Sequence, residues 1–129
     1  MIAVDTNVLV RFLARDDARQ AARAEELLRA NEVWISKTVL LETEWVLRSL
    51  YRIPPQTLAE ALGALLGLGS VVVEDELAVA KALEWFGKGL DFADAMHLAS
   101  AGNARRFATF DRKFARQARD VTKVETLLL

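Results

Sequence analysis

The chain has 129 residues and a net charge of −1, and 53% of its residues are hydrophobic. This length suffices for one domain with a hydrophobic core and leaves no room for a second catalytic unit. Cysteine is absent, which excludes disulfides, zinc–thiolate sites, iron–sulfur clusters and thiol nucleophiles and favours an intracellular location. No secretory signal is recognisable, and no uncharged stretch approaches the roughly 20 residues of a membrane span. We therefore expect a cytoplasmic protein without membrane contact.

Short apolar runs alternate with longer amphipathic segments along the chain, a pattern typical of repeated strand–helix units. The apolar runs predict strands at residues 2–4, 33–35, 71–73, 107–109 and 121–124. The amphipathic segments predict helices at residues 7–14, 18–30, 38–50, 55–67, 75–86, 92–103 and 111–117. Strands joined by crossover helices pair in parallel. We predict an α/β fold, a three-layer α/β/α sandwich with a central, mainly parallel sheet of four to five strands, and a single domain over residues 1–129.

Four acidic residues stand at or near the junctions between predicted elements: Asp5, Glu42, Asp94 and Asp111. Asp5 and Asp111 each follow an apolar run, and ligands of open parallel sheets bind at the carboxyl ends of the strands. Carboxylates that converge without basic neighbours repel one another, and a bound divalent cation relieves that repulsion. The sequence therefore predicts a cation site formed by these four residues.

Helical periodicity gives a further prediction for Glu42. In a helix over residues 38–50, Glu44 and Arg48 share one side, where we expect an ordinary solvated pair. Glu42 falls nearly opposite them, on a side that we assign to the interior or to a cleft. An ionised carboxylate there requires a cation or several hydrogen-bond donors. The alternative interpretation is a buried glutamate that pairs with an arginine or caps a neighbouring helix.

The segment Asp91–Asp94 has a competing structural interpretation, because an Asp at the N-cap with another acid three residues later favours a helix N-terminus. We interpret Asp91 as a cap or outer-sphere group and Asp94 as a direct ligand. Asp111 could equally cap the helix that follows it. Capping alone would explain Asp91 and Asp94.

Basic residues are concentrated near the C-terminal end of the chain. Residues 105–119 contain Asp111 as their only acid against Arg105, Arg106, Arg112, Lys113, Arg116 and Arg119. A basic surface beside an acidic pocket suits a polyanion bound over metal ions, and a solvated helix face is the competing interpretation. The single histidine, His97, excludes a histidine-rich metal site and a two-histidine ribonuclease. The aromatic residues are dispersed at core-like spacing, so we expect no base-stacking platform.

Four segments, in order along essentially the whole chain, resemble the motifs of the PIN domain: residues 4–10, 38–42, 91–99 and 109–114. The closest resemblance is to stand-alone toxin ribonucleases of toxin–antitoxin pairs, the VapC type. It implies an endoribonuclease that uses one or two Mg²⁺ or Mn²⁺ ions and metal-activated water. It also implies a homodimer and inhibition by a cognate antitoxin protein that lies across the active-site groove.

The same resemblance implies roles for individual residues. The metal ligands would be Asp5, Glu42, Asp94 and Asp111, and the supporting groups would be Thr6, Asn7 and Thr109. The additional Asp91 leaves the third ligand open. Arg112, Lys113 and Arg116 are the nearest candidates for contacts with the RNA backbone.

Three other functions share features with this sequence. A phosphatase of the haloacid dehalogenase type needs a second acid two residues after the first, where this chain has Asn7. A receiver-like signalling domain shares an acidic cation pocket but accepts phosphate on an aspartate in mid-chain. A PIN-like module that binds RNA or protein without catalysis is the third alternative, and the intact acids argue against it.

Overall fold

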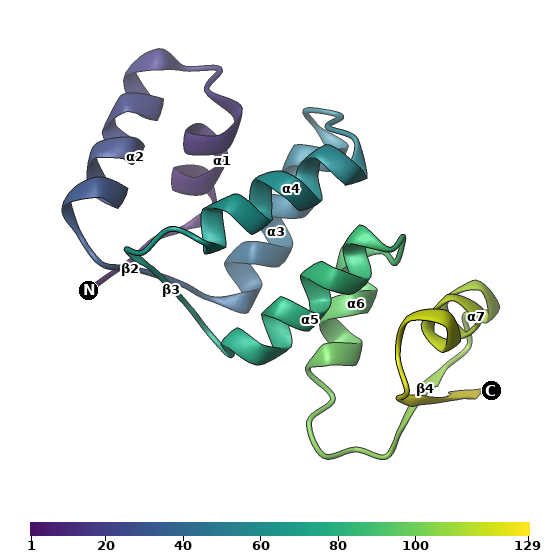
Figure 1. Cartoon of the computed structure of the whole chain (residues 1–129). Coiled ribbons are helices and arrows are strands. Elements are labelled where there is room, and N and C mark those ends of the chain that lie inside the picture. Colours follow the sequence, from purple (N-terminus) through teal and green to yellow (C-terminus); the bar gives the residue numbers. More distant parts are fainter. The chain divides into compact units, whose positions relative to one another are not determined.

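The computed structural model describes all 129 residues, which form seven helices and five strands (Figure 1). The chain divides into two compact units, Met1–Glu76 and Leu77–Leu129, called unit 1 and unit 2 below. No helix combines the length and the apolar character needed to cross a bilayer.

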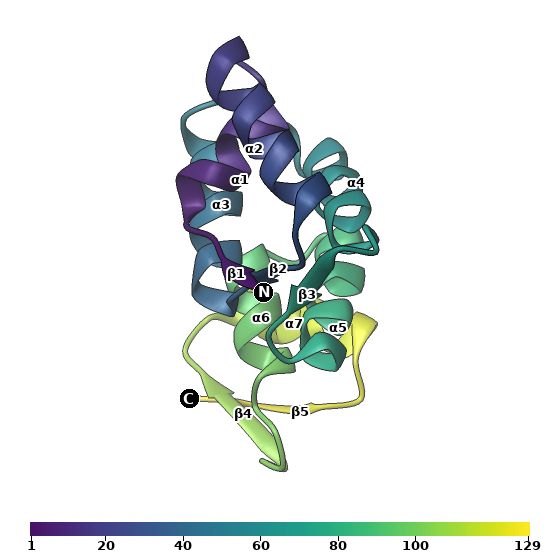
Figure 2. The ribbon, with the colours of Figure 1, turned by 90° about the vertical axis from the view of Figure 1, so that its left-hand side faces the viewer.

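Unit 1 contains a parallel three-stranded sheet with strand order β1-β2-β3 (Figure 2). Ile2 of β1 lies opposite Val33 of β2, which in turn lies opposite Val71 of β3. Two helices connect each pair of neighbouring strands, as parallel pairing requires. The elements are β1 (Ile2–Ala3), α1 (Thr6–Ala14), α2 (Ala18–Ala30), β2 (Val33–Ile35), α3 (Lys37–Ser49), α4 (Pro55–Leu66) and β3 (Val71–Val73).

The core of unit 1 forms where α1 packs against α2 and α3, and α4 packs against α3 and β3. Leu9 of α1, Leu47 of α3 and Leu58 of α4 are completely buried. Side-chain caps define where the helices begin: Asp17 caps α2 and Ser36 caps α3. These caps satisfy backbone N–H groups that have no partner within the helix.

Unit 2 contains three helices and a parallel pair of strands, β4 and β5, in which Arg106 lies opposite Glu125. Aromatic contacts hold its elements together: the rings of Phe86 and Phe92 lie 5.2 Å apart, and those of Phe107 and Phe114 lie 5.6 Å apart. The elements are α5 (Glu76–Gly87), α6 (Phe92–Ala99), β4 (Arg106–Thr109), α7 (Arg112–Val121) and β5 (Glu125–Leu128).

The α/β class with parallel strands is confirmed. The sequence analysis placed four to five strands in one sheet, whereas the structure has a sheet of three strands and a sheet of two. The predicted strand at residues 121–124 is wrong, because α7 continues to Val121 and β5 begins at Glu125. The buried stripe of Phe114, Ala115 and Ala118 has helical spacing, which carries the helix past its predicted end at residue 117.

Candidate functional site

Asp5 lies directly after β1 and is the N-cap of α1. Its Oδ1 atom accepts hydrogen bonds from the backbone N–H groups of Asn7, at 3.1 Å, and Val8, at 3.4 Å. The carboxylate is exposed, and these bonds use only one of its two oxygens. A helix N-terminus carries a partial positive charge, which stabilises an ionised carboxylate. The cap therefore fixes Asp5 at the end of a strand, where the sequence placed it.

Glu42 is connected to the same region of unit 1 by Thr6. The hydroxyl Oγ1 of Thr6, the first residue of α1, donates a hydrogen bond to Oε1 of Glu42 in α3. Thr6 is buried and Glu42 is exposed. Thr6, which directly follows Asp5, thus holds the side chain of Glu42. This contact is compatible with a supporting role for Thr6.

The predicted orientation of α3 is wrong. Glu42 lies on the exposed face of the helix with Trp45 and Ser49, while Glu44 is buried and only 2% exposed. Arg48 pairs with it, with Nε 2.7 Å from Oε2 of Glu44. The cause is the helix period, because the apolar stripe formed by Leu40 and Leu47 includes position 44. The buried glutamate paired with an arginine exists, but it is Glu44 and not Glu42.

In unit 2, Asp91 and Asp94 belong to the start of α6. Asp91 is the N-cap, and its Oδ2 accepts a hydrogen bond from the N–H of Asp94 at 3.1 Å. The cap role proposed for Asp91 is confirmed. Asp94 lies in the first turn and is half-buried.

Asp111 is the N-cap of α7, as its alternative interpretation proposed. Its Oδ1 accepts a hydrogen bond from the N–H of Phe114 at 3.0 Å. Its own N–H donates to Oγ1 of Thr109 at 3.0 Å. Thr109 therefore supports Asp111 through the backbone.

Among the acids Asp91, Asp94 and Asp111 of unit 2, the charges of the other two act on Asp94. The pKa of Asp94 is raised, first by burial and then by the negative charges of Asp91 and Asp111, against a smaller opposing effect of His97. None of the three acids forms an ion pair with lysine or arginine. No lysine or arginine therefore offsets the repulsion between Asp94 and its two acidic neighbours. This is the condition that a bound cation relieves, and hard carboxylate oxygens suit Mg²⁺ or Mn²⁺.

The four predicted ligands are divided between the two units. Asp5 and Glu42 belong to unit 1, and Asp94 and Asp111 belong to unit 2. In neither unit do three or more Asp, Glu, His or Cys side chains form a group that could hold a metal ion. Each unit by itself therefore supplies two of the four acids.

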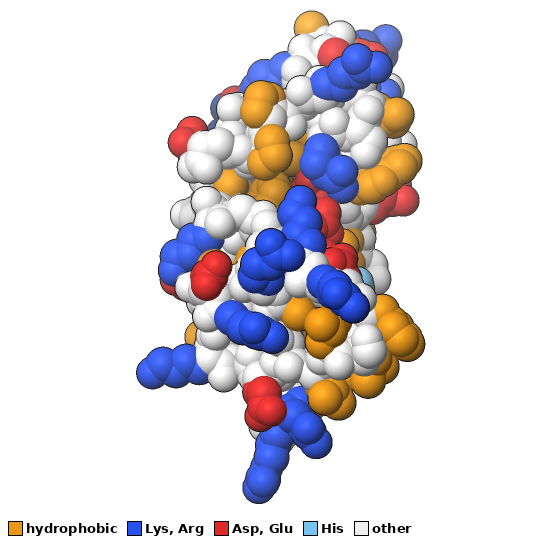
Figure 3. Space-filling model, turned by 90° about the vertical axis from the view of Figure 1, so that its right-hand side faces the viewer, with side chains coloured by type: hydrophobic (Ala, Val, Ile, Leu, Met, Phe, Trp, Pro, Cys, Tyr) orange, Lys and Arg blue, Asp and Glu red, His pale blue; other side chains and the backbone are white.

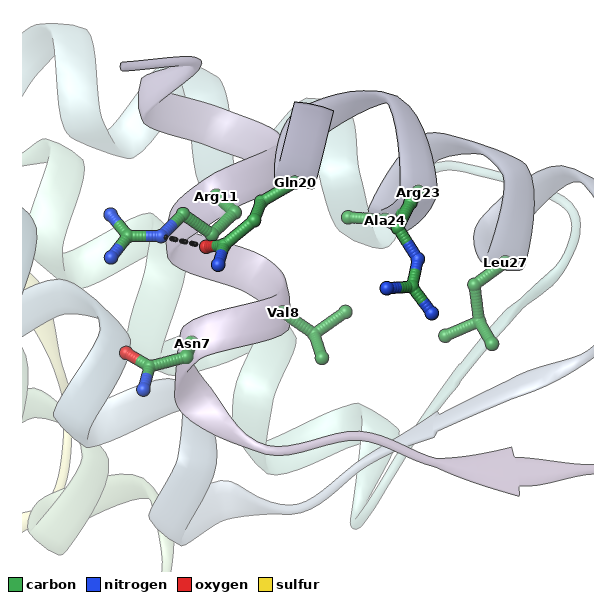
Figure 4. Close-up of a pocket in the computed structure, with 7 residues that line it drawn as sticks. All are labelled: Asn7, Val8, Arg11, Gln20, Arg23, Ala24 and Leu27. Atoms are coloured by element: carbon green, nitrogen blue, oxygen red, sulfur yellow. Dashed lines mark hydrogen bonds between the residues drawn. The ribbon is translucent and has the colours of Figure 1, made fainter. Parts of the chain in front are cut away.

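Asn7, predicted as a supporting group, lines a pocket of about 290 Å³ between α1 and α2 (Figure 4). The apolar side chains of Val8, Ala24 and Leu27 line this pocket, and Arg23 extends from α2 beside them. Arg11 donates to Oε1 of Gln20 at its edge, at 2.6 Å. Sequence reasoning missed the pocket because it depends on how two helices pack.

The predicted RNA-contacting residues Arg112, Lys113 and Arg116 are exposed on α7. Figure 3 shows lysine and arginine side chains at the surface of the protein. The preceding Phe110 is also exposed, although the sequence analysis counted it among core-like aromatics. Side chains alternate between the two faces of a strand, and in β4 Phe107 and Thr109 are the less exposed residues. Continuing this alternation by one residue would have predicted that Phe110 is exposed.

In a comparison with known families, the model of the PIN domain family matches residues 2–120. A comparison with curated proteins finds no match. PIN domains are usually nucleases that act on nucleic acids and generally use divalent metal ions. The matched range includes all four candidate acids and most of both units. The chain belongs to the PIN domain family.

Proposed function

We propose that this protein is a metal-dependent endoribonuclease and the toxin component of a toxin–antitoxin pair. Family membership supports nuclease activity in general. The observation that carries the proposal further is the placing of Asp94, half-buried near Asp91 and Asp111: burial first, and then the charges of these two acids, raise its pKa, and no lysine or arginine forms an ion pair with any of the three. Like charges near a half-buried carboxylate disfavour its ionised form, and a cation bound to that carboxylate would offset this effect.

The proposed ligands of Mg²⁺ or Mn²⁺ are Asp5, Glu42, Asp94 and Asp111, with one or two ions. These acids come from both units. We therefore also propose that residues 1–129 act as a single nuclease domain. When bound, the cation lowers the pKa of a water molecule and balances the charge that develops on the scissile phosphate.

The chain's own groups keep the ligands in place. Thr6 holds one oxygen of Glu42, and Thr109 holds the backbone N–H of Asp111. Asp91 caps α6 by accepting a hydrogen bond from the N–H of Asp94, which lies in the first turn. His97 is exposed and has no second histidine to act with. Attack by the RNA 2′-hydroxyl between two histidines is therefore excluded, and cleavage by water leaves 5′-phosphate and 3′-hydroxyl ends.

A protein partner is part of the proposal. The motifs resemble those of VapC-type toxins, which supports a cognate antitoxin and a homodimer. Trp45 and Leu50 are large hydrophobic residues exposed on or just after α3, and exposed apolar side chains of this size are enriched at protein interfaces. A small gene for a DNA-binding antitoxin beside this one, and co-purification of its product, would support this part of the proposal.

Cleavage of single-stranded RNA is the direct test. The purified protein is incubated with labelled RNA in Mg²⁺, in Mn²⁺ and in EDTA, and we expect cleavage only with the metals. Asp5→Asn and Asp111→Asn should reduce the rate by roughly 100-fold or more, because a carboxylate ligand is lost. Asparagine is as good an N-cap as aspartate, so both variants should fold normally.

Asp17→Asn is the matched control. Asp17 caps α2 through its Oδ1, at 3.0 Å from the N–H of Gln20, and is not a proposed ligand. Its variant should retain full activity. RNA binding without cleavage in any metal would favour the non-catalytic module, and acceptance of phosphate from a phosphodonor would favour the receiver-like domain.

A further inference from the structure

Phe110 is the most exposed aromatic residue of the chain, with 81% of its surface accessible. It lies between β4 and α7, next to the proposed ligand Asp111. Its ring takes part in neither of the aromatic pairs of unit 2. Isolated exposed hydrophobic residues are common, and Leu77 is 79% exposed in the same unit. The surroundings of Phe110 are what distinguish it.

The backbone on both sides of Phe110 is fixed by hydrogen bonds. The carbonyl of Thr109 accepts from the N–H of Leu129 at 2.9 Å, and the N–H of Asp111 donates to Oγ1 of Thr109 at 3.0 Å. Asp111 in turn caps α7. The exposed ring therefore extends from a fixed point of the fold, which reduces the entropy lost when a ligand binds to it.

Three exposed cations follow the ring on the first turns of α7: Arg112, Lys113 and Arg116. None of them forms an ion pair, whereas other basic residues of the chain, such as Arg11 and Lys88, pair with nearby acids. Unpaired cations beside an exposed aromatic ring form the combination with which proteins bind single-stranded nucleic acids, where bases stack and phosphates pair with the charges.

We propose that Phe110 is a stacking platform for a base of single-stranded RNA adjacent to the scissile phosphate, and that Arg112 and Lys113 bind the neighbouring phosphates. This inference rests on the proposed ribonuclease function and assigns to that site a residue that contacts the substrate. The position of Phe110 directly before Asp111 places the stacked base beside the bond to be cut.

A single RNA strand fits this surface better than a second copy of the chain or another protein. An apolar protein interface over Phe110 would have to remove water from three unpaired cations, which is unfavourable unless the partner supplies a matching acid for each. An RNA strand supplies an aromatic base and a negative phosphate in every nucleotide. Its chemistry therefore matches both parts of the surface.

The test measures RNA binding apart from cleavage. In the Asp5→Asn background, a short single-stranded RNA that carries a fluorescent adenine analogue is titrated with protein in the presence of Mg²⁺. Stacking on Phe110 should quench the fluorescence. We expect Phe110→Ala and Phe110→Leu to weaken binding by roughly 10- to 100-fold and to abolish the quenching, because base–aromatic stacking is lost. Phe110→Tyr should retain both.

Two matched controls accompany these variants. Leu77→Ala removes a hydrophobic side chain of similar exposure and should leave binding unchanged. Lys81 is an exposed lysine of α5 that forms no ion pair, so Lys81→Glu should have a much smaller effect than Lys113→Glu. Because Phe110 is exposed, its variants should keep the melting temperature of the parent protein.

The outcomes separate this inference from the proposed function. Unchanged RNA binding by Phe110→Ala and Phe110→Leu would overturn the inference even if the wild-type protein cleaves RNA. Loss of a dimer in Phe110→Ala with unchanged RNA binding would also overturn it, since the surface would then be a self-interface. Lost quenching in a protein whose wild-type form never cleaves RNA would support the stacking platform and reject the nuclease.

Discussion

Replacing Arg48 with methionine removes the guanidinium that pairs with the buried Glu44 while keeping a side chain of similar length. In the structure, Nε of Arg48 lies 2.7 Å from Oε2 of Glu44, and a second nitrogen lies 3.4 Å from Oε1. Only 2% of Glu44 is exposed, so water cannot replace the lost donors. Removing one partner of a fully buried pair costs roughly 3–5 kcal/mol. The Arg48 side chain is 38% exposed, so we expect a smaller loss of unfolding free energy, about 2–3 kcal/mol.

A double-mutant cycle isolates the pair. The unfolding free energies of the wild type, Arg48→Met, Glu44→Gln and the double variant are measured by urea denaturation at neutral pH. Arg48 takes part in a further interaction, and the cycle cancels its contribution. We expect a coupling energy of roughly 1.5–3 kcal/mol, as for a hydrogen bond to a buried charged group. The solvated pair predicted from the sequence would give only about 0.3–0.5 kcal/mol.

The pair Glu84–Lys88 is the matched control for this cycle. It has the same four-residue spacing, with Glu84 in α5 and Lys88 directly after its end, and the two charged groups are 3.1 Å apart, but both side chains are exposed. Its coupling energy should stay below about 0.5 kcal/mol. If the Glu44–Arg48 cycle gave a value equally small, the assignment of Glu44 to the interior would be refuted.

Three further predictions concern single side chains. Thr6→Val removes the hydroxyl that holds Glu42 and keeps the shape of a buried residue, so RNA cleavage should fall by roughly 10- to 100-fold with little change in melting temperature. The pKa of Asp16 is lowered, first by the hydrogen bond from Tyr51 at 2.8 Å. The ionised form of Asp16 therefore stabilises the fold above the unfolded pKa of about 3.9, and this stabilisation is lost as the pH falls through the folded pKa. The urea midpoint of Asp16→Asn should therefore depend less on pH in that range than the urea midpoint of the wild type. The pKa of Asp94 is raised, so its charged form is disfavoured by the fold, and Asp94→Asn should raise the melting temperature of the metal-free protein while abolishing cleavage.

Much of the fold could be predicted because its signals are local. The helix predicted at residues 18–30 has the bounds of α2, and the apolar triplets at 33–35 and 71–73 are the bounds of β2 and β3. These segments are defined by their own caps and periodicity. The last strand was predicted at the wrong residues because Val121 and Val124 are apolar and β-branched, as strand residues often are. The buried stripe of α7 instead extends the helix to Val121. The division of five strands between two sheets depends on pairing between distant segments, which no local pattern reports.

The candidate site was predictable in its residue types but not in its contacts. The hydrogen bond from Thr6 to Glu42 joins residues 36 positions apart, and only the packing of α1 against α3 brings them together. Helical periodicity correctly separated Glu42 from Glu44, but the choice of the buried side was wrong. Glutamate 44 enters the interior because Leu40 and Leu47 set the buried stripe and Arg48 neutralises the charge. The sequence shows which residues share a face, and the structure shows which face is covered.

Helix capping and metal binding, which the sequence analysis treated as competing explanations, are compatible in this fold. Asp5 and Asp111 cap their helices through Oδ1, as Asp17 does at α2. A cap fixes the orientation of the carboxylate, and a carboxylate of fixed orientation is better suited to be a metal ligand. Capping cannot account for Asp94 or Glu42, because neither is an N-cap. Asp94 in particular is half-buried beside two like charges that disfavour its ionised form. A side chain that makes the fold less stable in this way is best explained by the activity of the site, and this is why Asp94 is the acid whose replacement best separates stability from catalysis.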